Sequence, residues 1–387
     1  MFIRENLWFQ INYLFVSSEI KEKTERILKM LVEKKLGGVL INSQHNFSWI
    51  TAGANNGIDL SRENGAASIL IRNDGKKFVL ANRIEMPRML DEEISNEDFE
   101  SIDFAWEDEK SSSDFLTNRA LSLLKNGEKI GADLFINAAT PIIEGDIARC
   151  RYELTDAEIE RFRALGKDAG ETLGELIITL QIGDSEIEIA RKTKDALAAK
   201  NIYSVVTLVA TDERIQKFRH PVPTEKCWKK VLMIVVCTKR QGLIASLSRI
   251  ICDGKIPAEL RKRTDACARV NAKILAATKQ GATSAGLYKI AADAYAAENF
   301  AGEEKLHHQG GASGYKTRDW VAHPNSSEVV QNNQAFAWNP SITGTKTEET
   351  VIVRESGIEI ITATPNFPQI TVEIEGREYL SPDILSL

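Results

Sequence analysis

The chain has 387 residues, a length that suits two ordinary domains better than one. With 43% hydrophobic and 27% charged residues, it has the composition of a globular protein that buries a sizeable core. The net charge of −6 is spread along the sequence, so there is no electrostatic reason to expect nucleic acid or an anionic membrane as a partner.

Cysteine usage and the N-terminus indicate the compartment. The five cysteines are odd in number and include no C-x-x-C pair, which favours reduced thiols over a disulfide framework or a zinc site. Residues 1–15 are aromatic but interrupted by polar residues such as Glu5 and Gln10, so we expect no signal peptide. No apolar run approaches the ~20 residues of a membrane span. These features predict a cytoplasmic protein without a membrane segment.

The first third of the chain alternates helical and extended patterns. Apolar residues at helical spacing predict a helix over residues 18–36, which Gly37 and Gly38 can end. The turn composition Asn73-Asp74-Gly75 predicts a hairpin over residues 66–81. The remaining expected elements are strands at Gly38–Asn42, Asn46–Thr51, 101–106 and 129–134, and helices at 84–94 and 114–125. Together they predict a small α/β domain with a mixed sheet over residues 1–150.

The pattern changes near residues 145–155, and a second domain is expected over residues 151–387. Two long helices are each predicted to open with a capping box, Thr155 with Glu158 and Ser185 with Glu188. Strands are then expected at 204–211 and 230–251, helices at 257–279 and 284–300, and strands at 335–339 and 347–362. This order is an approximate internal duplication, which predicts an α+β domain with a site between its halves.

Five landmarks in the second domain stand in a fixed order. They are His220 in KFRHPVP, the strand pair VCTKRQGLIASLSR at 236–249, the loop HHQGGASG at 307–314, Asn339-Pro340-Ser341, and Glu348 in TEETVIV. Their order resembles that of the creatinase, prolidase and aminopeptidase P family, over about residues 40 to 385. The resemblance implies the pita-bread fold, with a small creatinase-like N-terminal domain before a duplicated C-terminal domain.

The same resemblance implies where metal ligands would stand. The two metal-binding aspartates of the family correspond to Val235 and Ser246, the histidine to Gly311, and the two glutamates to Asn339 and Glu348. Four of the five ligands are therefore replaced. Because divalent metals in oxygen-rich sites need several carboxylates, we expect no dinuclear centre and no cofactor.

The leading hypothesis is a metal-independent hydrolase that cleaves a C–N bond in a small nitrogen-rich metabolite, as creatinase and ectoine hydrolase do. His220 is the expected acid/base, because histidine titrates near neutral pH. Glu348 is expected to pair with a substrate cation or to orient water. His308 is the third candidate catalytic residue. The candidate substrate-binding residues are His307, Gln309, Arg318, His323 and Asn339, with Arg318 clamping a substrate carboxylate.

Two other functions stay open. The chain is also consistent with a non-catalytic binding module for a peptide or protein partner. A third interpretation is an Xaa-Pro peptidase whose shifted metal site is built from His307, His308, His323 and Glu348. The family resemblance further implies a homodimer and a small-molecule or short-peptide substrate.

Simpler roles exist for several of these residues. His220 precedes Pro221 and could merely end a strand, and Arg318 could pair with its neighbour Asp319. Glu348 and Glu349 alternate along an extended segment, so Glu349 is expected to face solvent. Arg249 is expected to act as a structural brace.

Overall fold

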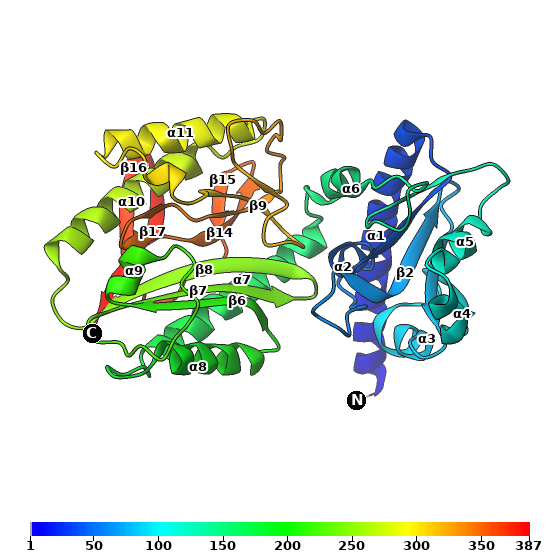
Figure 1. Ribbon diagram of the computed structural model, residues 1–387, viewed down its shortest axis with the longest axis horizontal. Helices are drawn as coiled ribbons and strands as arrows, with labels where there is room; N and C mark the ends of the chain where they lie inside the picture. Colours follow the sequence, from blue (N-terminus) through cyan, green and yellow to red (C-terminus); the bar gives the residue numbers. More distant parts are fainter. Residues whose placement is uncertain (1) are drawn as a thin grey trace. The chain divides into compact units, whose positions relative to one another are not determined.

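The computed structural model describes residues 2–387, with side chains described from residue 16 onward. It divides into two compact units, Met1–Arg151 and Tyr152–Leu387 (Figure 1). The expectation of no signal peptide concerns residues 1–15, whose side chains lie outside the described part. Among the described residues, no helix is long and apolar enough to cross a membrane.

Unit 1 is built on a five-stranded mixed sheet in the order β4-β3-β2-β1-β5. The predicted hairpin is confirmed: β2 and β3 pair antiparallel, and Gly75 in the turn between them has a φ of 86°. β1 runs parallel to β5, and β3 runs parallel to β4. The elements are α1 (Phe2–Lys34), β1 (Gly38–Ser43), α2 (Gln44–Ile50), β2 (Asn64–Arg72), β3 (Lys77–Asn82), α3 (Met86–Arg88) with a π-helical turn (Met89–Glu93), β4 (Glu100–Phe104), α4 (Trp106–Ser111), α5 (Phe115–Leu121), β5 (Ile130–Ala132) and α6 (Glu144–Arg151).

The strand predicted over Asn46–Thr51 is wrong, because this segment lies in helix α2. Ser43 caps the helix by accepting a hydrogen bond from the backbone N–H of Asn46. All seven residues of α2 are buried, so its apolar residues are not confined to one face. A short, wholly buried segment carries no periodicity that separates helix from strand.

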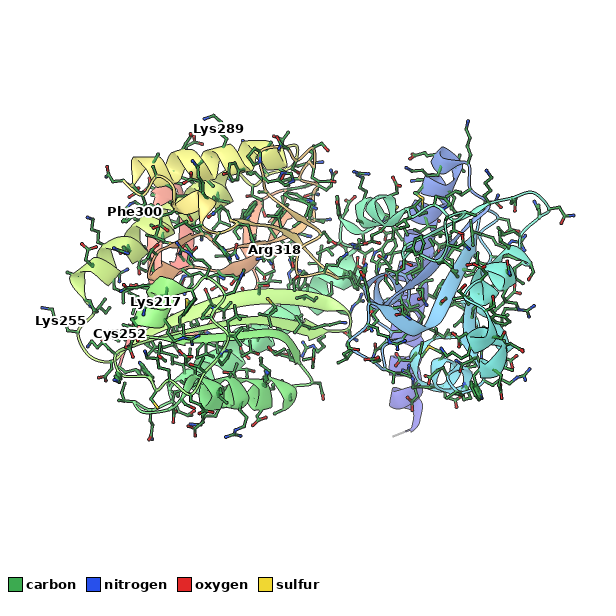
Figure 2. The ribbon with its side chains drawn as sticks, in the orientation of Figure 1. Lys217, Cys252, Lys255, Lys289, Phe300 and Arg318 are labelled. Carbon is green, nitrogen blue, oxygen red and sulfur yellow. The ribbon has the colours of Figure 1, made fainter. Side chains whose placement is uncertain are left out.

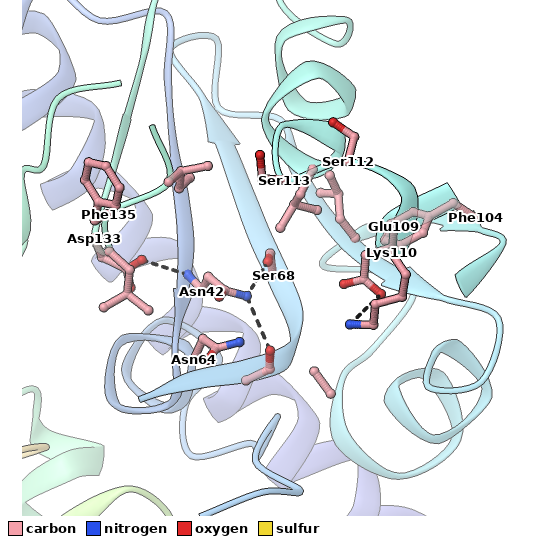
Figure 3. Close-up of a pocket in the computed structure, with 16 residues that line it drawn as sticks. Asn42, Asn64, Ser68, Phe104, Glu109, Lys110, Ser112, Ser113, Asp133 and Phe135 are labelled. Atoms are coloured by element: carbon pink, nitrogen blue, oxygen red, sulfur yellow. Dashed lines mark hydrogen bonds and ion pairs between the residues drawn. The ribbon is translucent and has the colours of Figure 1, made fainter. Parts of the chain in front are cut away.

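A cavity of about 360 Å³ lies against the unit 1 sheet (Figure 3). The Asn42 side chain donates to Ser68 Oγ at 2.7 Å, and its backbone N–H donates to Asp133 at 2.9 Å. Asp133 also accepts from the backbone N–H and hydroxyl of Ser43 and from the Asn46 amide. These polar groups of the cavity wall are therefore engaged with one another.

Unit 2 contains two larger sheets, β18-β8-β7-β6 and β10-β9-β11-β14-β15, and two hairpins, β12-β13 and β16-β17. Helices α7 and α8 lie along the first sheet (Figure 1). The helices are α7 (Asp156–Ile177), α8 (Glu186–Ala198), α9 (Glu213–Lys217), α10 (Ala258–Ala277) and α11 (Ser284–Ala297), with a 3-10 turn at Glu303–Lys305. The strands are β6 (Tyr203–Thr211), β7 (Val231–Arg240), β8 (Leu243–Cys252), β9 (Gly310–Ser313), β10 (Trp320–Val321), β11 (Ala335–Trp338), β12 (Ser341–Ile342), β13 (Thr345–Lys346), β14 (Glu349–Arg354), β15 (Gly357–Ile360), β16 (Gln369–Ile374), β17 (Arg377–Pro382) and β18 (Ile384–Ser386).

Local capping signals explain where the first two helices of unit 2 begin. Thr155 and Glu158 form the complete predicted capping box at the start of α7. At α8 the Ser185 hydroxyl accepts from the Glu188 backbone, while the Glu188 carboxylate lies 3.7 Å from Lys192. The elements follow the predicted order, and the equivalence of the two halves of the unit stays a prediction.

Strand β8 joins the two sheets of unit 2. All ten of its residues are buried, since both of its faces are covered. The Ser246 backbone N–H donates to Thr350 Oγ1 at 2.7 Å, and that hydroxyl donates back to the Ser246 carbonyl at 2.9 Å. The backbone N–H of Ser248 donates to the carbonyl of Glu348 at 3.1 Å. These bonds fix the segment that carries Glu348 against the first sheet.

Candidate active site

A cavity of about 320 Å³ lies within unit 2. Five of the eight candidate site residues line it, although they come from separate segments of the chain. Apolar side chains of β6 and β7 supply much of the remaining wall. The lining residues are Val206, Leu208, His220, Val235, Cys237, His308, Thr317, Arg318, Asn339, Lys346 and Glu348.

Glu348 is buried and is held by two cations of the protein itself. Its Oε1 lies 3.2 Å from Nη2 of Arg318, and its Oε2 lies 3.0 Å from Nζ of Lys346. Burial alone would raise the pKa of Glu348, but Lys346 and Arg318 outweigh it, and the pKa is lowered. The carboxylate is therefore ionised and already neutralised. Within the described residues Glu348 is thus paired with cations of the protein, and its role towards a substrate cation or a water molecule stays a prediction.

Lys346 is the cavity residue that the sequence analysis missed. It lies in β13, two residues before Glu348, and only 8% of its surface is exposed. In an extended segment, residues two apart point to the same side. The spacing Lys346-x-Glu348 could therefore have predicted the pair.

Arg318 lines the cavity and is held there by two hydrogen bonds. Its Nη1 donates to the Thr317 carbonyl at 2.6 Å, and its Nη2 donates to Glu348. Figure 2 shows Arg318 within the body of unit 2, whereas Lys289 projects from the outer side of α11. Its ion pair thus runs to Glu348, 30 residues away in the sequence.

Three histidines gather at the cavity. Nε2 of His220 lies 3.1 Å from Nε2 of His307, and the ring of His307 stacks on that of His308 with 4.4 Å between centroids. Burial, followed by the charge of Lys346, lowers the pKa of His220, and the same two causes lower that of His307 to about 2. Burial and Arg318 lower the pKa of His308 to about 4. All three rings are therefore neutral at pH 7, and in the His220–His307 pair one Nε2 donates a hydrogen bond while the other accepts it.

Three predicted substrate-binding residues, His307, Gln309 and His323, are not among the side chains that line the cavity. Gln309 is buried, where it accepts from the Tyr295 hydroxyl at 2.6 Å and donates to the His307 carbonyl at 2.5 Å. It holds the loop that carries the histidines. His323 is exposed and accepts a bond from the backbone of Asn325. Its place in the sequence, 12 residues after Gly311, puts it beyond β10 and outside the cavity wall.

Glu349 corrects a second expectation, since it is buried and not solvated. It faces away from Glu348 and pairs with Arg249 at 2.8 Å, and it accepts a hydrogen bond from the Thr362 hydroxyl. Arg249 also donates to Thr364 and to the carbonyls of Ser248 and Thr362, so it is the predicted brace. The expectation failed because β14 is covered on both faces.

The positions that correspond to metal ligands do not fit a dinuclear centre. Val235 offers no donor atom, and the one carboxylate, Glu348, is flanked by two cations. At Gly311 a Cβ would stand 2.0 Å from the backbone oxygen of Trp320, so a side chain cannot replace this glycine without moving β10. The backbone packing and the charges both disagree with a divalent metal pair at this place.

A single-metal site is a separate question. The four residues of the shifted-site interpretation do not come together, because His323 lies outside the cavity wall. In their place, ring nitrogens of His220, His307 and His308 lie within 4.8 Å of one another, a geometry that could hold one ion. Lys346 acts electrostatically on all three rings and opposes a cation there.

Comparison with known proteins agrees with the fold. Residues 160–360 match the model of metallopeptidase family M24. The structure is similar to an Xaa-Pro dipeptidase from Bacillus anthracis, with a TM-score of 0.74, 17% identity, and coverage of 95% of this chain and 100% of that one. It is similar to a prolidase from Pyrococcus horikoshii OT3, with a TM-score of 0.73, 19% identity, and coverage of 89% and 98%.

A third similar structure is not described as a peptidase. The N-terminal domain of the FACT complex subunit SPT16 from chickpea, Cicer arietinum, has a TM-score of 0.68 and 9% identity, with coverage of 90% of this chain and 97% of that one. No curated protein matches the sequence. At these identities the likeness shows the fold, which is mixed α/β with a pita-bread type domain.

Proposed function

The chain belongs to metallopeptidase family M24, and on that premise we propose that it is a hydrolase that cleaves a C–N bond in a small nitrogen-rich metabolite without a dinuclear metal centre. The observation that carries the proposal is one cavity lined by a neutral His220 and two cationic side chains, while four of the five ligand positions offer no carboxylate.

His220 supports acid/base chemistry through its protonation state. Since burial and Lys346 lower its pKa, the ring is neutral at pH 7 and accepts a proton from a water molecule. The water oxygen adds to the carbon, the C–N bond breaks, and His220 returns the proton to the departing nitrogen. His307, 3.1 Å from His220, orients the ring, so we assign it a positioning role.

Lys346 and Arg318 supply positive charge for the oxygen on which negative charge develops. Glu348 is proposed to hold both cations in place and is therefore a positioning residue. His308 and Asn339 remain proposed substrate contacts. The apolar side chains of Val206, Leu208 and Val235 line the same cavity and strengthen the interactions of these charges relative to bulk water.

The experiment is a measurement of amine and ammonia release, in excess chelator, from guanidino acids, cyclic amidines and Xaa-Pro dipeptides. Wild type is compared with His220→Ala, for which we expect a loss of roughly 100-fold or more. His323→Ala is the matched control, because that histidine lies outside the cavity wall, and it should retain activity. Full turnover by His220→Ala would rule out the assigned role of His220.

A second candidate function is a binding module without turnover. The similarity to the SPT16 domain and the internal neutralisation of Glu348 favour it. A partner captured by the wild-type protein but not by a Lys346→Met variant, with no product released from the substrate panel, would support this function over hydrolysis.

The family resemblance also supports a homodimer in the cytoplasm that acts on a small molecule or short peptide. Light scattering would test the dimer, for which the expected mass is twice the 43.1 kDa of one chain.

A further inference from the structure

The charges that line the unit 2 cavity do not cancel. Lys346 and Arg318 carry two positive charges, Glu348 carries one negative charge, and the three histidines are neutral at pH 7. Glu348 has a lowered pKa, so protonation does not change this count at neutral pH. One positive charge is therefore left without a counter-ion among the described residues that line the cavity.

Several hydrogen-bonding groups of these side chains also lack partners. Among the described residues, the Lys346 ammonium, which has three N–H donors, pairs only with Glu348. The buried Nε of Arg318 has no acceptor, and the buried Oδ1 of Asn339 has no donor, within the same part of the chain. The cavity thus presents unmatched donors on its cations and an unmatched acceptor on its amide.

Such an arrangement is costly to keep for stability alone. A buried charge without a counter-ion destabilises the folded state, and so do buried donors without acceptors. The apolar wall of Val206, Leu208 and Val235 strengthens the field of the surplus charge. A negatively charged ligand would satisfy both deficits, whereas a cation or a metal ion would add to the surplus.

We propose that the cavity is an anion receptor, which binds a small organic acid through its carboxylate on Lys346 and Arg318 and through an N–H group on Asn339. The cationic side chains thus reverse the charge preference of a site whose corresponding positions hold metal ions in the resembled family. Lys346 is the residue that determines this preference. The inference uses the cavity of the proposed function and rests on it for the ligand's size, but it concerns binding and is tested without turnover.

The first test is a calorimetric titration of the wild-type protein at pH 7.5 with three compounds of similar size. N-acetylglycine carries a carboxylate, N-acetylglycinamide is its neutral counterpart, and N-acetylethylenediamine is cationic. We expect the acid to bind at least about tenfold more tightly than the amide, since a hydrogen-bonded charge is worth roughly 1.5–3 kcal/mol. The cation should bind most weakly. Absence of a preference for the acid would overturn the proposal.

The second test changes the charge of the cavity one unit at a time. Lys346→Met removes the surplus positive charge of the cavity, so it should weaken binding of N-acetylglycine by about tenfold or more. Glu348→Gln leaves two positive charges in the cavity without a counter-ion, so it should strengthen the binding of N-acetylglycine. Lys262→Met removes a charge from an exposed position on α10 and should leave the affinity unchanged. Weaker binding of the acid by Glu348→Gln would instead show that Glu348 itself contacts the ligand, and the receptor would be excluded.

The binding titrations and the hydrolysis assay test different proposals, so their outcomes can be told apart. Binding of the acid with no turnover across the substrate panel would leave the receptor standing and refute the proposed hydrolase. If Lys346→Met does not fold, the three-compound series on the wild type decides the proposal alone.

Discussion

Two buried clusters in this chain are built from histidine, arginine and glutamate, yet they differ in how completely their charges are matched. In unit 1, Glu144 accepts from His45 at 3.1 Å, from Arg151 at 3.0 Å and from Asn46 at 2.6 Å. Arg151 donates in addition to the Asn46 carbonyl oxygen at 2.6 Å. The ions of this cluster are each held by partners within the unit.

The unit 2 cluster leaves a cation in surplus. Glu348 shares its charge between Lys346 and Arg318, and His307 has a buried Nδ1 without a hydrogen-bond partner among the described residues. Residue types therefore do not distinguish a structural cluster from a candidate site. The difference between the two clusters lies in whether the charges are matched, since a buried charge without a counter-ion destabilises the folded state.

The largest effect is expected for Arg151→Met in the matched cluster. This change removes a buried guanidinium from the half-buried Glu144 carboxylate, so we expect a loss of about 3 kcal/mol in the free energy of unfolding. Urea denaturation followed by tryptophan fluorescence would measure it. Arg149→Met, an exposed position on α6, is the control and should change little. A loss as small as that of Arg149→Met would contradict the claim that the unit 1 cluster stabilises the fold.

A smaller effect is expected on the free energy of unfolding at acid pH, through the protonation of His307. The pKa of His307 is lowered to about 2, by burial first and then by Lys346, His308, His220 and Arg219. The unfolded chain binds a proton near pH 6.5 but the folded chain does not, so stability is present above that pH and is lost as pH falls. Between pH 7 and pH 5 this histidine should account for a loss of about 2 kcal/mol.

His307→Gln, which cannot titrate, isolates this contribution. The difference in unfolding free energy between variant and wild type should change over that pH interval, and urea denaturation at both pH values measures it. A difference independent of pH would mean that folding does not lower the pKa of His307.

Lys346→Met sharpens the comparison with Arg151→Met. Removal of Lys346 leaves Glu348 paired with Arg318 and cancels the surplus charge, so we expect a change in unfolding free energy within about 1 kcal/mol. The same urea experiment applies. A loss as large as that of Arg151→Met would class the unit 2 cluster as structural.

The smallest effect is expected for metals. Because Lys346 and Arg318 oppose a cation in the cavity, addition of zinc or manganese ions, or of chelator, should leave the Tm of the protein within ~1 °C. Differential scanning fluorimetry would measure it. A rise with zinc that disappears in His220→Ala would favour a single-metal site at the three histidines.

Part of the candidate site was accessible to sequence reasoning because its residues lie in recognisable motifs. His220, His308, Asn339 and Glu348 were found from their place among ordered landmarks, and Arg318 from its residue type. All five line one cavity. The capping box at Thr155 was likewise local, since both partners lie within one helical turn.

Other features of the fold and of the site depend on how helices and sheets pack, which no local sequence pattern shows. The burial of Glu349 follows from coverage of both faces of β14, and the helical state of α2 follows from its complete burial. The three histidines meet because residues 87 positions apart, His220 and His307, are brought to 3.1 Å.

By itself, the sequence predicted the family, the order of the elements, the replacement of four metal ligands and five of the side chains that line the cavity, because these are properties of spacing and residue type. Only the tertiary structure decided what those side chains do to one another. The charge state and preference of the cavity depend on the contacts of Glu348 with Arg318 and Lys346, and Coulomb interactions are set by distance and burial in space.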